Sequence, residues 1–139
     1  MLYNFIIKNL TLSVILLTSI TILIIFELNE FIQSKNSINP EKAIDLINHQ
    51  NAIIIDIRNE NEFKQCHVIN SVNIPYNKLI TYKNILKKYK KKIIIIMHNK
   101  NNLAQKAIKQ LKNNELNEIL YINDGINAWN KNNLPTNKK

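Results

Sequence analysis

One apolar stretch near the N-terminus constrains this chain more than any other feature. Residues 9–26, NLTLSVILLTSITILIIF, contain no charged side chain, and none occurs between Lys8 and Glu27. As an α-helix these 18 residues would be about 27 Å long, close to the thickness of a bilayer's hydrocarbon core. The sequence therefore predicts one N-terminal transmembrane helix, spanning about 9–26 within an anchor of residues 1–34.

Two alternatives to an anchor can be weighed. A cleaved signal peptide needs small residues at its cleavage site, and the sequence that follows, FELNEFIQSKN, offers no such pattern. A buried core helix is disfavoured because residues 40–135 contain enough elements for a whole domain. We expect a single-pass protein of the cell membrane, with lipid as the first partner.

The orientation in the membrane is weakly specified. Lys8 and the α-amino group lie before the stretch, and Lys35 and Lys42 follow it, so the positive-inside rule is nearly balanced. The abundance of lysine in the rest of the chain gives a slight preference for a cytoplasmic domain.

Composition limits the other classes of function. The chain has 19 Lys and Arg against 10 Asp and Glu, but it is also rich in Ile and Asn and has one glycine. We interpret the net charge of +9 as a coding bias toward A/T-rich codons and expect no nucleic acid partner. A basic membrane-surface module built on Lys87–Lys92 (KKYKKK) stays open as an alternative.

Cysteine and histidine are too sparse for several kinds of site. The single cysteine, Cys66, excludes an intrachain disulfide and a multi-cysteine zinc site. The three histidines lack metal-ligand spacing; they are His49, His67 and His98. The sequence predicts no metal and no cofactor.

Beyond a short polar linker at residues 35–39, strands and helices alternate. Asn39 and Pro40 are typical of a helix start, and apolar runs such as AIIIDI predict strands covered on both faces. Strands are predicted at 52–57, 71–74, 93–97 and 119–122, and helices after Pro40 and over 60–65, 79–89, 103–111 and 125–131. The alternation predicts an α/β domain over residues 40–136, with a parallel sheet and helices on both faces.

Two motifs resemble those of the rhodanese-like (sulfurtransferase) domain. That family shows a strand ending in Asp-x-Arg, then Glu with an aromatic residue, Gly-His-Ile and a later Pro; near its C-terminus it shows Gly-Gly, an apolar residue, Trp and Leu-Pro. The first motif is matched by Asp56, Arg58, Glu62, Phe63, His67 and Pro75, and the second by Gly125, Ile126, Trp129, Leu134 and Pro135. The resemblance covers about residues 38–136 and, with the apolar helix, implies a membrane-anchored single-domain protein of bacterial type.

Structural roles are expected for these motif residues. Arg58 is the only guanidinium in the chain, and its planar fork suits a bidentate pair with Asp56 or Glu62; a substrate-facing role is the alternative. Trp129 is expected in the core. His67 is expected to be a hydrogen-bonded structural residue rather than a base or a ligand.

The loop after the strand at 93–97 decides whether a sulfurtransferase activity is expected. In active members this loop begins with a cysteine, and the loop amides and the next helix stabilise its thiolate and persulfide. Aligning the helix on Ala107 and Leu111 puts His98 at the cysteine position, Asn101 where a glycine is usual and Leu103 where an arginine is usual. An imidazole cannot carry sulfur as a persulfide, so no catalytic residue is predicted in this former active-site loop, which is formed by His98, Asn99, Lys100, Asn101, Asn102 and Leu103.

Three hypotheses follow from these observations. The leading one is a membrane-tethered rhodanese-like domain that is catalytically inactive and serves as a binding or scaffold module, with a partner among membrane proteins. The second is a divergent sulfurtransferase or persulfide carrier that uses Cys66, although the resemblance implies that Cys66 lies away from the catalytic loop. The third is the basic membrane-surface module at Lys87–Lys92. His98 acting as a base or binding an anion with the loop amides also stays open.

Overall fold

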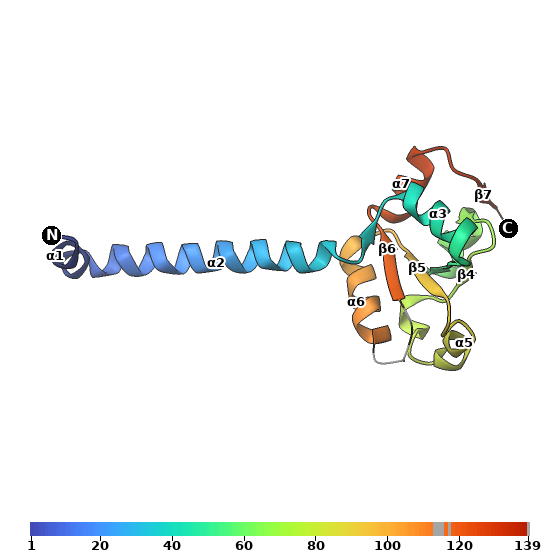
Figure 1. The fold of residues 1–139 in the computed structure, drawn as a ribbon, viewed down its shortest axis with the longest axis horizontal. Helices are drawn as coiled ribbons and strands as arrows, with labels where there is room; N and C mark the ends of the chain where they lie inside the picture. Colours follow the sequence, from blue (N-terminus) through green and yellow to red (C-terminus); the bar gives the residue numbers. More distant parts are fainter. Residues whose placement is uncertain (113–115, 117, 139) are drawn as a thin grey trace. The chain divides into compact units, whose positions relative to one another are not determined.

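The computed structural model describes residues 1–112, 116 and 118–138. The chain divides into two compact units, Met1–Lys35 and Asn36–Lys139 (Figure 1). Each unit makes most of its contacts within itself.

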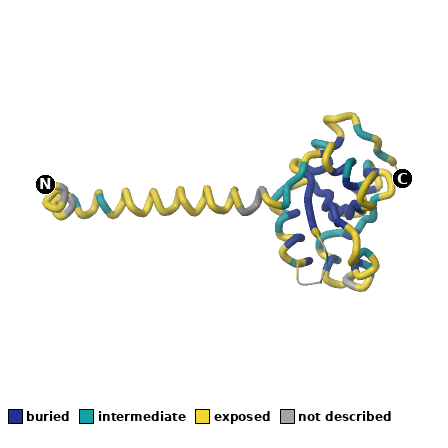
Figure 2. Tube along the Cα trace, viewed as in Figure 1, coloured by how far each residue is buried: buried dark blue, intermediate teal, exposed yellow. Residues whose placement is uncertain are grey.

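The first unit is helical and apolar. Helix α1 covers Leu2–Lys8, and α2 covers Leu10–Ser34. Within α2, Leu10–Asn29 has a mean hydropathy of 2.3 and no buried residue, so it is long and apolar enough to cross a membrane (Figure 2). The hydroxyls of Thr18, Ser19 and Thr21 donate to carbonyl oxygens about one turn earlier. These bonds lower the cost of placing the hydroxyls in lipid.

The second unit contains every strand of the structure's described part. Its strands are β1 (Ser37–Ile38), β2 (Ile53–Asp56), β3 (His67–Val68), β4 (Val72–Asn73), β5 (Ile93–Met97), β6 (Glu118–Ile122) and β7 (Thr136–Asn137). Its helices are α3 (Pro40–Gln50), α4 (Glu60–Gln65), α5 (Lys83–Lys87), α6 (Asn101–Leu111) and α7 (Gly125–Lys131), with a 3-10 turn η1 (Tyr76–Lys78).

Five strands form one parallel sheet in the order β1-β6-β5-β2-β4. The five side chains of β5 are all buried and alternate between two cores. Ile94 and Ile96 pack with α5 and α6, whereas Ile93, Ile95 and Met97 pack with α3 and α7. Each such isoleucine contributes about 1.5–3 kcal/mol through burial. The prediction of a parallel α/β domain with helices on both faces is confirmed.

Local signals in the sequence explain several of the boundaries. The Asn39 side chain accepts from Lys42 N at 2.8 Å and caps α3, whose first residue is Pro40. Asn59 and Glu62 form a complete capping box on α4. The predicted bounds of α4, β5 and α7 are confirmed to the residue.

Three short strands and one helix differ from expectation. Residues 37–38, predicted as part of a polar linker, form edge strand β1, and β3 with β7 makes a separate antiparallel pair that the sequence did not predict. The helix expected over 79–89 is broken into turns, with α5 limited to Lys83–Lys87. The run of lysines that follows is a poor match for an α-helix because neighbouring like charges repel.

Candidate functional site

The loop between β5 and α6 lies at the carboxyl edge of the parallel sheet. Met97 ends β5 and its carbonyl accepts from Ile57 N at 2.9 Å, which fixes the end of β5 against the end of β2. His98 follows, and α6 begins at Asn101. This is the edge at which parallel α/β sheets place their binding and catalytic groups.

His98 points into the protein and is completely buried. Its Nε2 lies 2.9 Å from the carbonyl oxygen of Ile122, at the end of β6, so Nε2 must carry the hydrogen and donate it. The other ring nitrogen, Nδ1, is buried and has no hydrogen-bond partner among the residues that the structure describes. The Tyr121 ring lies 5.7 Å away, centroid to centroid.

Burial lowers the pKa of His98 below 6.5, although the hydrogen bond to Ile122 and the carboxylates of Asp124 and Asp56 oppose that shift. The imidazole is therefore neutral near pH 7. Because the ring is enclosed and its donor nitrogen is already engaged, it is poorly placed to exchange protons with a ligand in solvent.

Gly125 supports His98 from α7. A Cβ at position 125 would lie 2.1 Å from His98 O and 3.1 Å from His98 Nδ1, and the residue has φ +48°. The same carbonyl of His98 accepts from Ile126 N at 3.0 Å. Only glycine combines this left-handed backbone with so close an approach.

Asparagine side chains hydrogen-bond the rest of the loop to neighbouring elements. Asn99 Nδ2 donates to Glu62 Oε1 at 2.9 Å. Asn101 Nδ2 donates to Asn123 Oδ1 at 2.7 Å, and Asn101 Oδ1 accepts from Asp124 N at 3.0 Å. Asn101 is the first residue of α6 and has an ordinary helical backbone. Its place, where the resemblance expects a glycine, therefore involves no left-handed strain.

The remaining loop residues have simpler environments. Lys100 precedes α6 without capping it through its side chain, and both Lys100 and Asn102 are exposed. Leu103 is half-buried and packs against the core under α6. An apolar contact thus occupies the position at which the family resemblance leads one to expect an arginine.

The predicted pairing of Arg58 with Asp56 is present and buried. Arg58 Nε lies 3.0 Å from Asp56 Oδ1, and Nη2 lies 2.7 Å from Oδ2. Nη2 also donates to Cys66 O at 2.6 Å. Arg58 therefore joins the end of β2 to the end of α4, and the residue is 6% exposed.

His67 and Cys66 lie at the end of α4. The ring of His67 stacks on Phe63 at 4.0 Å, and its Nδ1 lies 2.8 Å from Phe63 O. The Cys66 thiol lies 3.8 Å from Asn130 Oδ1. His98 contacts the start of α7 at Gly125, and Asn130 lies five residues further along, so about 8 Å of helix separates the two contact points on α7.

Trp129 packs in the core under α3 and α7, where it is 2% exposed. Its Nε1 donates to Pro135 O at 3.2 Å, which holds the C-terminal segment beside α7. The indole also forms one wall of a pocket.

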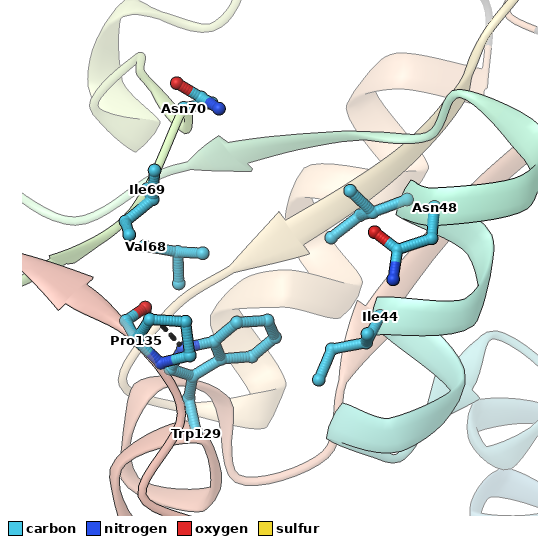
Figure 3. Close-up of a pocket in the computed structure, with 8 residues that line it drawn as sticks. Ile44, Asn48, Val68, Ile69, Asn70, Trp129 and Pro135 are labelled. Atoms are coloured by element: carbon cyan, nitrogen blue, oxygen red, sulfur yellow. Dashed lines mark hydrogen bonds between the residues drawn. The ribbon is translucent and has the colours of Figure 1, made fainter.

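An apolar pocket of about 400 Å³ lies away from the loop (Figure 3). Ile44 and Asn48 of α3 face Val68, Ile69 and the Trp129 ring across it. None of residues 98–103 lines it. The sequence predicted Ile44 and Ile47 only as a helix stripe, because the pocket depends on the turn at 68–70, which is distant in sequence. Among the described residues, no group of three or more His, Cys, Asp or Glu side chains could hold a metal ion.

Comparisons with known proteins agree with this architecture. The family description "Rhodanese-like domain" matches residues 39–132. The chain belongs to the rhodanese-like domain family. An uncharacterized protein of Buchnera aphidicola subsp. Schizaphis graminum is 37% identical over 138 residues, covering 97% of this chain and 92% of the relative. The uncharacterized protein YibN of Escherichia coli is 26% identical over 96 residues, covering 68% and 66%.

Solved structures of similar fold include a rhodanese-related protein from Thermoplasma volcanium. It is 27% identical, the match covers 75% of this chain and 99% of that one, and the TM-score is 0.63. A thiosulfate sulfurtransferase from Pseudomonas aeruginosa is 17% identical with a TM-score of 0.66, covering 81% of this chain and 22% of that one. At that identity the second likeness shows the fold alone.

Proposed function

We propose that this protein is a membrane-tethered rhodanese-like domain that does not transfer sulfur and instead acts as a binding or scaffold module. One observation carries the proposal. The position that the resemblance gives to the nucleophilic cysteine holds His98, whose ring is buried and bonded to Ile122 O. A nitrogen at this position cannot form the persulfide on which sulfur transfer depends.

The environment of the loop supports the same conclusion. Leu103 packs against the core where a charged residue would bind an anion, and Asn99 and Asn101 use their side chains to fasten the loop to the neighbouring elements. These contacts restrain the loop. A restrained surface suits recognition of a partner, because less ordering entropy is lost on binding.

Helix α2 is the segment that would anchor the protein in a membrane. Its apolar part, Leu10–Asn29, has 20 residues, which corresponds to about 30 Å of helix and matches the hydrocarbon core of a bilayer. We place the protein in the cell membrane as a single-pass protein, with the domain on the cytoplasmic side. A cleaved signal sequence would instead release the domain, and the size of the mature protein distinguishes the two.

Sulfur transfer can be tested on the full chain in lipid nanodiscs. Thiosulfate:cyanide transfer by the wild-type protein should not exceed that of a His98→Ala variant. Cys66→Ser is the matched control for the chain's only thiol. Activity well above His98→Ala would refute the proposal, and loss of that activity in Cys66→Ser would identify the protein as a persulfide carrier.

A binding role can be tested with photo-crosslinkers. One is placed at Asn99 in the loop, one at Ile69 on the rim of the apolar pocket, and one at Asn132, an exposed residue after α7, as a control. Crosslinks to a single membrane protein from one of the first two sites, absent from the control, are expected. A pattern that is identical at all three sites would contradict a specific binding surface.

A further inference from the structure

The apolar pocket described above is built from α3, the turn after β3, α7 and the segment that follows α7. Six of its eight lining residues are apolar, and the other two are Asn48 and Asn70. None of the eight carries a charge. A concave, mostly apolar surface with a few polar groups is the usual form of a small-molecule site.

Hydrogen bonds hold the walls of the pocket in place. Trp129 Nε1 donates to Pro135 O at 3.2 Å, which fixes the C-terminal segment beside the indole. Ser71 Oγ donates to Val68 O at 2.6 Å and closes the turn after β3. The third wall is α3, a helix of three turns that is capped at its start. Because the pocket is formed before a ligand arrives, binding costs the protein little conformational freedom.

The rim of the pocket leaves apolar surface open to solvent. Ile69 is 42% exposed, and Ile44 and Ile47 are half-buried. Within the described part of the unit Asn36–Lys139, the other exposed large apolar side chains are Ile80 and Tyr82. A ligand that covers Ile69 and fills the space beside Ile44 removes apolar surface from water, which favours binding.

The lining also decides which polar groups the pocket can accept. A charged group that enters it gives up hydration and meets no opposite charge on the walls, which is costly. Asn48 lies on α3 across from Val68 and Trp129 (Figure 3). Its side-chain amide makes no hydrogen bond to another residue in the described part of the chain, so a donor and an acceptor are both available. A neutral group that also has a donor and an acceptor, such as an amide, matches Asn48.

The volume of the pocket limits the size of the ligand. A pocket of about 400 Å³ has the volume of about 13 water molecules at about 30 Å³ each. On that scale the pocket holds a ligand of about 10–15 non-hydrogen atoms.

We propose that the apolar pocket binds a small, uncharged, mostly apolar molecule whose single amide group pairs with Asn48. The inference goes beyond the proposed function, because the pocket shares no residue with the loop at 98–103 and does not depend on the position of α2. Selectivity comes from the uncharged lining and from the amide that α3 presents.

Titration of the full chain in detergent micelles with benzamide tests the proposal. Benzamide combines an aromatic ring with one amide, and benzoate is its charged counterpart of the same size. Trp129 lines the pocket and is the only tryptophan, so its fluorescence reports occupancy. We expect a saturable change with a Kd of about 0.1–1 mM for benzamide. Benzoate should bind at least about fivefold more weakly.

A charge placed on α3 tests the role of Asn48. Asn48→Lys should weaken the binding of benzamide and strengthen the binding of benzoate, each by at least about threefold. The matched control is Asn127→Lys, because Asn127 is an exposed residue of α7 that does not line the pocket. It adds the same charge and should change neither affinity.

A second pair of variants tests the apolar rim and adds no charge. Ile69→Gln should weaken benzamide binding by about threefold or more, since it removes apolar surface that the ligand covers. The control is Ile80→Gln, which replaces an exposed isoleucine outside the pocket and should leave the affinity unchanged. Because both side chains are exposed, neither change disturbs the core.

Four results would overturn the proposal. They are a Trp129 signal that does not saturate with benzamide, equal affinities for benzamide and benzoate, an unchanged preference in Asn48→Lys, or equal effects of Ile69→Gln and Ile80→Gln. Sulfur transfer is measured by a different assay on a different part of the domain, so this proposal and the proposed function fail separately.

Discussion

Replacing the buried residue Gly125 with alanine should destabilise the domain strongly. The new Cβ would lie 2.1 Å from His98 O, and ordinary contact begins near 3.4 Å, so the atoms must separate by 3.4 − 2.1 = 1.3 Å. That movement weakens the bond from Ile126 N to His98 O, which measures 3.0 Å. It also disturbs the end of β5.

The free-energy cost has separable parts. Alanine at φ +48° costs about 1 kcal/mol, loss of one hydrogen bond about 1 kcal/mol, and overpacking about 1–3 kcal/mol. The reduced freedom of the unfolded chain returns about 0.4–1 kcal/mol. The free energy of unfolding should therefore fall by about 3 kcal/mol, which is a large share of the stability of a small domain.

Urea unfolding of the full chain in detergent micelles measures this loss. Trp129 is the only tryptophan, so its fluorescence reports on the domain and not on α2. With a slope of about 2 kcal/mol per molar urea, the midpoint should fall by about 1.5 M. Asn133→Ala is the control, because Asn133 has φ 52° and is exposed and its replacement costs only about 1 kcal/mol of backbone strain. A Gly125→Ala midpoint equal to or above that of Asn133→Ala would refute the close approach to His98.

Three further substitutions probe the same domain by urea unfolding. Because burial lowers the folded-state pKa of His98, the unfolded chain binds the proton more tightly, and stability should fall as pH drops below 6.5, by at most about 1.4 kcal/mol per pH unit. His98→Gln keeps a donor for Ile122 O and does not titrate, so it should lack this component; stability curves that run parallel to wild type would contradict the assignment. Arg58→Met leaves the Asp56 carboxylate buried without its partner and should cost about 3–5 kcal/mol, whereas the double variant with Asp56→Asn should cost less than the sum of the two single changes; additive losses would argue against the pair. Asn39→Ala removes the cap of α3 and should cost about 1 kcal/mol, while Asn39→Ser should retain most of the stability, and equal losses in the two would mean that the cap contributes nothing.

The central strands and several helices were predictable because their signals are local. The isoleucines of β5 leave no polar side chain for solvent, and Asn59 with Glu62 marks the start of α4 in sequence as clearly as in structure. Strands β1, β3 and β7 were not predictable, since two residues carry no periodicity. Their pairing is decided by which segments the tertiary fold brings together.

In the candidate site, too, some features were predictable from the sequence and others were not. The planar guanidinium of Arg58 predicted a carboxylate partner but left Asp56 and Glu62 open, and the structure shows Asp56. The direction of the His98 ring could not be predicted, since its acceptor, Ile122 O, is 24 residues away. The need for glycine at position 125 likewise appears only once His98 O is placed against α7.

The outer strands have a consequence for how the protein is made. Strand β1 begins at Ser37 but pairs with β6 near Tyr121, and β3 at His67 pairs with β7 near Asn137. Neither pairing can form before the last third of the chain has been synthesised, although the apolar helix emerges first. Contacts between segments so distant in sequence form slowly. Strands β1 and β3 therefore stay unpaired until late in translation, and we expect assistance from chaperones to matter more for this domain than its small size suggests.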